Sequence, residues 1–153
     1  MADHGTAGPI QTSVSIAAPT PVVWRVLTDP ELMKRWMGEP EMELEVRTTW
    51  RVGSPVVISG THHVRFSKDG TVLRFEPERL LAYSHRSSLS DLPDEPASYT
   101  ELEFALSAAG TGTSLTFTAR NFPTESVYRH LALYWKGTMQ VVKRVADQLA
   151  EQR

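Results

Sequence analysis

The chain has 153 residues, of which 41% are hydrophobic and 22% are charged, as in an ordinary single globular domain. Its formal net charge of −2, with both signs interspersed, argues against nucleic-acid binding. The absence of cysteine excludes disulfides, thiolate metal sites and cysteine nucleophiles, and it fits a cytoplasmic location. No apolar run reaches the roughly 18 residues of a membrane span, and the start does not resemble a signal peptide.

The first predicted elements are a strand and two short helices. We expect residues 1–9 to be a flexible leader. Residues 10–16 alternate between apolar and polar side chains, which predicts a strand. Thr20-Pro21 and Asp29-Pro30 each combine a capping residue with a proline suited to the first helical turn. They predict one helix that ends at Leu27 and a second one at about residues 31–37.

The middle of the chain predicts about six antiparallel strands. Residues 42–50 alternate strictly, with Met, Leu, Val and Trp on one face and glutamates mainly on the other. Further strands are predicted at 55–61, 66–76, 80–87, 99–107 and 113–121. The turn between the first two of these lies at 62–65 or at 67–70, because both stretches carry turn signals. Residues 88–98 form a long loop, and long loops often serve as lids or binding loops.

Residues 124–153 predict one long amphipathic helix. Its apolar side chains recur at steps of three and four, from Val127 through Trp135 to Leu149. About 26 helical residues need a large apolar partner surface, because helix propensity alone rarely stabilises a helix in water. We therefore predict one α+β domain at residues 10–153, in which a curved antiparallel sheet wraps around the C-terminal helix.

Short motifs in a fixed order add a family resemblance that covers nearly all of the chain after Thr12. They are Ala18 to Leu32, Arg35-Trp36-Met37, Gly53-Ser54-Pro55, Gly70 to Leu73, Phe75 to Leu80, Tyr83-Ser84-His85, Leu92-Pro93-Asp94 and Trp135. This set resembles the heat-shock-protein-90 ATPase activator homologue-like family of the SRPBCC (START and pollen-allergen-like) superfamily. The resemblance implies a helix-grip fold, with an apolar cavity between a seven-stranded sheet and the long helix. It does not fix the function, because relatives include lipid carriers, hormone receptors and polyketide cyclases.

The candidate site residues are those expected to face this cavity. Strand parity places Leu81, Tyr83 and His85 on one face, so His85 could hold a ligand oxygen or act as a base with Tyr83. The alternative is a core histidine that is hydrogen-bonded to a neighbour. The predicted cavity residues are Trp36, Met37, Trp50, Tyr83, His85, Tyr99, Phe104, Phe117, Leu131, Tyr134, Trp135 and Met139. Most of them could equally be plain core.

Other polar residues are assigned to the rim or to the surface. Arg86, Leu89, Leu92 and Arg120 are the predicted rim residues, with the arginines available for a carboxylate or phosphate. In a strand, His62 and His63 would point to opposite faces, whereas in a turn their rings could converge. We predict no metal site and no cofactor. His130 is expected to be a solvated or rim residue of the long helix.

The preferred hypothesis is a protein that binds a small apolar or amphipathic molecule between sheet and helix. One alternative is a cyclase-like, aldolase-like or hydrolytic enzyme that uses His85 with Tyr83 or Tyr99. Another is a protein-interaction module of the co-chaperone kind. An exposed strand edge makes either a monomer or a homodimer compatible with the sequence.

Overall fold

The computed structural model describes residues 8–152, so most of the predicted leader lies outside the described residues. The helices and strands are β1 (Ile10–Ile16), α1 (Thr20–Thr28), α2 (Pro30–Met37), β2 (Glu45–Thr48), β3 (Pro55–His62), β4 (Val64–Glu76), β5 (Leu80–Ser87), β6 (Thr100–Ala109), β7 (Gly112–Arg120) and α3 (Glu125–Glu151). This order confirms the predicted α+β, helix-grip arrangement.

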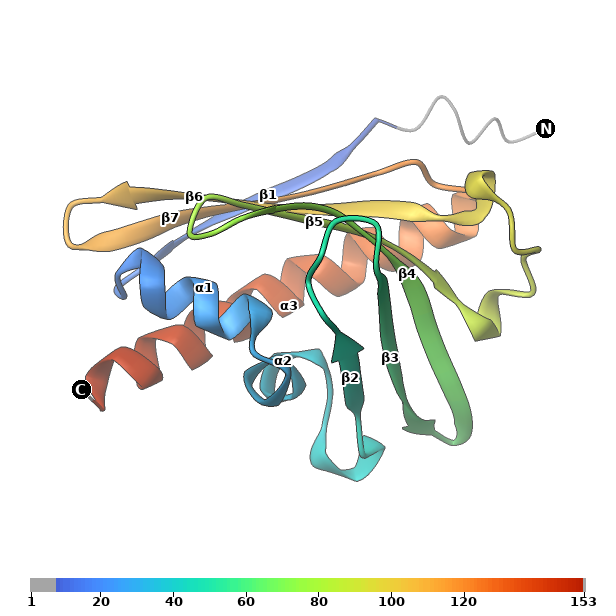
Figure 1. Ribbon diagram of the computed structural model, residues 1–153, viewed down its shortest axis with the longest axis horizontal. Coiled ribbons are helices and arrows are strands. Elements are labelled where there is room, and N and C mark those ends of the chain that lie inside the picture. Colours follow the sequence, from blue (N-terminus) through green and yellow to red (C-terminus); the bar gives the residue numbers. More distant parts are fainter. Residues whose placement is uncertain (1–7, 153) are drawn as a thin grey trace.

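The strands form one antiparallel sheet in the order β1-β7-β6-β5-β4-β3-β2. Figure 1 shows the sheet curving over α3, with α1 and α2 beside the helix and β2, β3 and β4 bending down past it. The inner face of the sheet is therefore the face that the long helix covers.

The long helix begins where its sequence provides a cap. The Thr124 hydroxyl accepts a hydrogen bond from the Val127 N–H, which satisfies one of the free amides of the first turn. The 27 residues of α3 extend over about 40 Å. Its buried face includes Leu131, Trp135, Met139 and Val142, so the three-and-four spacing correctly identified the side that packs on the sheet.

The strand predicted at residues 42–50 is shorter in the structure, where β2 spans only Glu45–Thr48. Residues 40–42 form a single 3-10 turn instead. Glu43 and Trp50 adopt positive φ angles of 49° and 57°, which take the chain out of the extended conformation at both ends. The alternation was real, because Leu44 and Val46 are both buried, but it did not reveal these two turns.

The β3–β4 hairpin turns at His63, where His62 pairs with Val64 and His63 has a φ angle of 67°. Of the two registers that the sequence allowed, the one with the turn at residues 62–65 is therefore correct. β4 begins two residues earlier than predicted and passes continuously through residues 67–70. Gly70 is required there by close packing, because a Cβ atom would overlap the carbonyl oxygen of Ser84.

Candidate functional site

Aromatic side chains fill the middle of the space between the sheet and α3. The Trp135 ring is stacked on Phe117, with 4.1 Å between the ring centroids, and it also meets Phe104 at 5.7 Å and Trp36 at 6.1 Å. Tyr83 and Met139 are completely buried in the same cluster. Six of the residues expected to line a cavity thus belong to a packed core (Trp36, Tyr83, Phe104, Phe117, Trp135 and Met139).

The polar atoms of this cluster differ in how they are satisfied. The indole N–H of Trp36 donates to the Val26 carbonyl at 2.8 Å, and that of half-buried Trp50 donates to the Thr28 carbonyl at 2.7 Å. These bonds attach α1 to the rest of the core. The Trp135 Nε1 atom is buried and has no hydrogen-bond partner among residues 8–152.

A pocket lies at one end of the interface, between the end of β5, the loop at residues 88–98 and the beginning of α3. We call it the end pocket, and its volume is about 310 Å³. Its apolar lining comes from Leu89, Leu92, Pro123, Val127 and Leu131. Its polar lining comes from His85, Arg86, Ser87, Ser90, Ser98, Thr100, Ser126 and His130.

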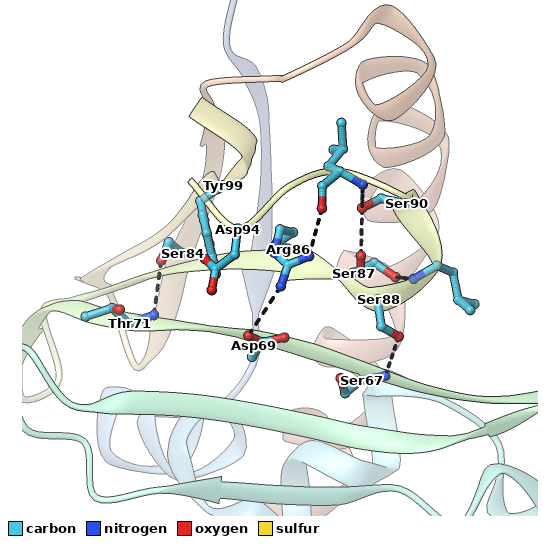
Figure 2. Close-up of polar contacts among 12 residues, drawn as sticks. Ser67, Asp69, Thr71, Ser84, Arg86, Ser87, Ser88, Ser90, Asp94 and Tyr99 are labelled. Carbon is cyan, nitrogen blue, oxygen red and sulfur yellow. Dashed lines mark hydrogen bonds and ion pairs between the residues drawn. The ribbon is translucent and has the colours of Figure 1, made fainter. Parts of the chain in front are cut away.

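The loop over the end pocket is held in place by polar contacts that Figure 2 shows together. The Arg86 guanidinium donates to the Leu92 carbonyl at 3.0 Å, and the Ser67 N–H donates to the Ser88 hydroxyl at 2.9 Å. The Ser87 hydroxyl accepts from the Leu89 N–H at 3.2 Å. These bonds place Leu89 and Leu92 at the pocket, where the sequence had predicted rim residues.

His85 also lies where strand parity predicted, on the inner face of β5. It is partly buried, it pairs with Thr100 in the β5–β6 ladder and it lines the end pocket. Burial, with a smaller contribution from the nearby Lys68 ammonium, lowers the pKa of His85 to about 3. At neutral pH the imidazole is therefore uncharged and can both donate and accept one hydrogen bond.

Lys68 was not singled out from the sequence. It lies on the inner face of β4, with its ammonium 5.2 Å from the centre of the Tyr134 ring, and burial lowers the pKa of the amine. Strand parity could have identified Lys68 as inward-facing, because it is an even number of residues from buried Val72. The unresolved register of the β3–β4 hairpin concealed it, since one alternative placed Lys68 in a turn.

Tyr99 and Arg120 lie away from both the core cluster and the end pocket. Tyr99 was expected in the cavity, but it immediately precedes inward-facing Thr100 and therefore lies on the outer face of the sheet. Its hydroxyl donates to the Asp94 carboxylate at 2.6 Å, and its ring lies 5.6 Å from the Arg86 guanidinium. Arg120, expected at the rim, is exposed and forms an ion pair with Glu103 at 3.5 Å.

Met37 and Tyr134 line a different depression, between α2 and α3, with a volume of about 670 Å³. Basic residues Lys34, Arg35 and Arg144 surround it, so we call it the basic groove. The Tyr134 hydroxyl donates to the Met37 carbonyl at 3.3 Å. The sequence placed these two residues in the same cavity as His85, whereas the structure separates them from the end pocket.

The other histidines of the described residues show no metal-binding arrangement. His62 and His63 are exposed at the β3–β4 turn with their ring centroids 4.7 Å apart. Within residues 8–152, no cluster of three or more His, Asp or Glu side chains could hold a metal ion. His130 is exposed and lines the end pocket, in agreement with its predicted place at a rim.

Across the described part of the chain, no helix combines the length and the apolar character that crossing a lipid bilayer would require.

A curved antiparallel sheet around one long helix, with a pocket at its open end, defines the helix-grip class of proteins. The family model described as "Activator of Hsp90 ATPase homolog 1-like protein" matches residues 17–151. The chain therefore belongs to this family, as the ordered motifs had indicated. No curated protein matches the sequence significantly.

Solved structures of bacterial proteins share the fold over almost the whole chain. A solution structure of a Cytophaga hutchinsonii protein is 28% identical, with a TM-score of 0.77 and coverage of 95% of this chain and 97% of that one. The Aha1 dimer from Colwellia psychrerythraea is 19% identical, with a TM-score of 0.72 and coverage of 92% and 97%. CalU16 from Micromonospora echinospora is 23% identical, with a TM-score of 0.67 and coverage of 94% and 84%.

Proposed function

We propose that the protein binds a small apolar or amphipathic molecule in the end pocket. The observation that carries the proposal is the convergence of apolar side chains from three separate segments on one concave site. Leu89 and Leu92 come from the loop, Leu131 from α3 and Pro123 from the segment that precedes it. Polar residues, His85 among them, border the same space. Ligand pockets typically combine apolar side chains with polar groups that fix the orientation of the ligand.

The volume of the end pocket sets the size of the ligand. At about 310 Å³, the end pocket lies at the small end of the range of about 300–1,000 Å³ that is usual for ligand pockets. The ligand is therefore a short alkyl chain or one to two rings, unless part of it extends into solvent. A large polycyclic lipid would exceed this volume.

The geometry favours binding over catalysis by His85. An imidazole with a pKa of about 3 is a weak base at neutral pH, far from the value that suits a general base. Tyr83 is buried in the core, and Tyr99 lies on the other face of the sheet. Tyr99 therefore does not share the inner face with His85, and the side chain of Tyr83 is part of the core.

We further propose that the protein is cytoplasmic and that it is a monomer or a homodimer. The absence of cysteine supports the location. The Aha1 dimer from Colwellia psychrerythraea supports testing for a dimer, and sedimentation at several protein concentrations would distinguish the two states.

Filling the end pocket from α3 tests the proposal. Val127 lines this pocket and Val141 lines the basic groove, and both are half-buried on the same helix. Decanol and 2-naphthol should bind the wild type and the Val141→Trp variant, as measured by native mass spectrometry and titration calorimetry. Val127→Trp should abolish binding.

Ser126→Trp gives a second obstruction from an exposed position, in case the first variant folds poorly. Circular dichroism confirms the fold of each variant. Binding that survives both obstructions, or that Val141→Trp removes instead, would contradict the proposal.

A further inference from the structure

Lys68 projects from β4 into the space between the sheet and α3. In the β4–β5 ladder it is paired with Ser87, which lines the end pocket. Its ammonium lies over the Tyr134 ring, and its side chain remains partly accessible. Lys68 is therefore the neighbour, across the β4–β5 ladder, of a residue that lines the proposed binding site.

The surroundings of Lys68 supply no negative charge. Within residues 8–152, no carboxylate oxygen lies within 4.0 Å of its ammonium. The neighbouring Asp69 belongs to the opposite face of the strand, where it approaches Arg86 at 4.0 Å. The groups that face Lys68 are His85 from β5 and Tyr134 from α3, and both are uncharged at neutral pH.

An unpaired cation in such an environment is costly. A cation removed from water loses hydration energy, and proteins usually compensate for this with a paired charge. The aromatic ring of Tyr134 compensates only in part, since a cation–π contact is weaker than an ion pair with an anion. Burial lowers the pKa of the amine, because removal from water disfavours its charged form.

Two histidines connect Lys68 to the end pocket. His85 lines the pocket and is close enough to the Lys68 ammonium for the charge to depress its pKa. His130 also lines the pocket, and its ring stacks on Tyr134 with 6.2 Å between the centroids. An acidic group bound in the pocket between these histidines would therefore approach the ammonium. The first turn of α3 borders the same pocket, and the positive end of a helix favours an anion.

We infer that the end pocket selects amphipathic molecules with one carboxylate, whose apolar part packs on Leu89, Leu92 and Val127 and whose acidic group binds Lys68. The inference rests on the proposed function and adds the chemical class of the ligand. A single ammonium matches a monoanion, whereas a phosphate dianion would leave one charge uncompensated. Neutral His85 can donate a second hydrogen bond to the carboxylate.

A comparison of decanoate with decanol tests this inference, because the two probes differ only in the head group. Titration calorimetry at neutral pH, below the micellar concentration, should show that wild-type protein binds decanoate about tenfold or more tightly than decanol. This comparison needs no variant, so it holds even if a substitution disturbs folding.

Lys68→Met should reduce decanoate affinity about tenfold or more and leave decanol affinity within about twofold. Lys68→Arg should retain the preference for decanoate, since it keeps the positive charge. Lys136→Met is the matched control, because Lys136 is exposed on α3 and lines neither the end pocket nor the basic groove. It should bind both probes as the wild type does.

The outcomes separate this inference from the proposed function. Equal affinity for the two probes, or no loss of decanoate binding in Lys68→Met, would overturn the carboxylate preference while leaving the pocket assignment intact. If neither decanoate nor decanol binds the wild type, the proposed function itself fails.

Discussion

Replacing Trp135 by alanine tests whether the centre of the interface is a packed core or the wall of a cavity. The side chain is only 4% exposed, and its ring stacks on Phe117 at 4.1 Å while meeting Phe104 and Trp36. Truncation removes this buried surface and leaves a void, which typically costs about 3–5 kcal/mol. For a domain of this size, each 1 kcal/mol lowers Tm by about 2–4 °C, so we expect a decrease of roughly 6–20 °C.

Urea and thermal denaturation followed by circular dichroism measure the effect of Trp135→Ala. Trp135→Phe is the matched control, because it keeps a ring against Phe117 and removes an indole N–H that has no partner among the described residues. The phenylalanine variant should lose only about 1 kcal/mol. A loss below about 1 kcal/mol for Trp135→Ala would refute the packed-core interpretation and indicate that Trp135 borders a ligand cavity.

Three further predictions follow from individual contacts. The pKa of His85 is about 6.5 in the unfolded chain and about 3 in the folded protein, so acid favours the unfolded chain. The free energy of unfolding should therefore fall by about 2 kcal/mol when the pH is lowered from about 7 to about 5. His85→Gln should lose this part of the pH dependence in urea denaturation, and an unchanged profile would contradict the burial of His85. Lys68→Met should raise the free energy of unfolding by about 1–2 kcal/mol, because a partly buried cation without an ion-pair partner is removed, and a lower Tm would contradict this. Wild-type stability should also rise with pH from the lowered pKa of Lys68 in the folded protein up to about pH 10.5, where the unfolded chain also loses this proton, and Lys68→Met should not show this rise. Gly70→Ala should lower the free energy of unfolding by about 1–3 kcal/mol, because the added methyl group would overlap the Ser84 carbonyl. Gly137→Ala, in open space on α3, should raise the free energy of unfolding by about 0.5–1 kcal/mol. Equal effects of the two substitutions would contradict the close approach of Gly70 to Ser84.

Local patterns predicted most of the fold because they repeat over many residues. The spacing from Val127 to Leu149 correctly identified the buried face of α3, and alternation correctly identified the inner residues of β5 and β7. Where a single residue changes the backbone direction, the pattern was not sufficient. Glu43 and Trp50, with positive φ angles, ended β2 although the alternation continued around it.

The candidate site was harder to predict because it depends on distances between segments. Strand parity predicted that His85 points inward, and the length of the loop at residues 88–98 suggested that Leu89 and Leu92 lie at a binding site. All three residues line the end pocket. The sequence could not show that Trp135 and its neighbours fill the middle of the interface, since packing density is a three-dimensional property. Lys68 was missed for a related reason, because its direction depended on a hairpin register that the sequence left open.

Mapping a bound ligand by methyl NMR tests the central claim most directly. On titration with decanoate, we expect the largest chemical-shift changes at the methyl groups of Leu89, Leu92, Val127 and Leu131, the aliphatic residues that line the end pocket. The two methyl groups of Val141 in the basic groove serve as the internal reference, and their chemical shifts should not change. Saturating changes at Val141 without changes at the four end-pocket residues would contradict the assignment of the binding site.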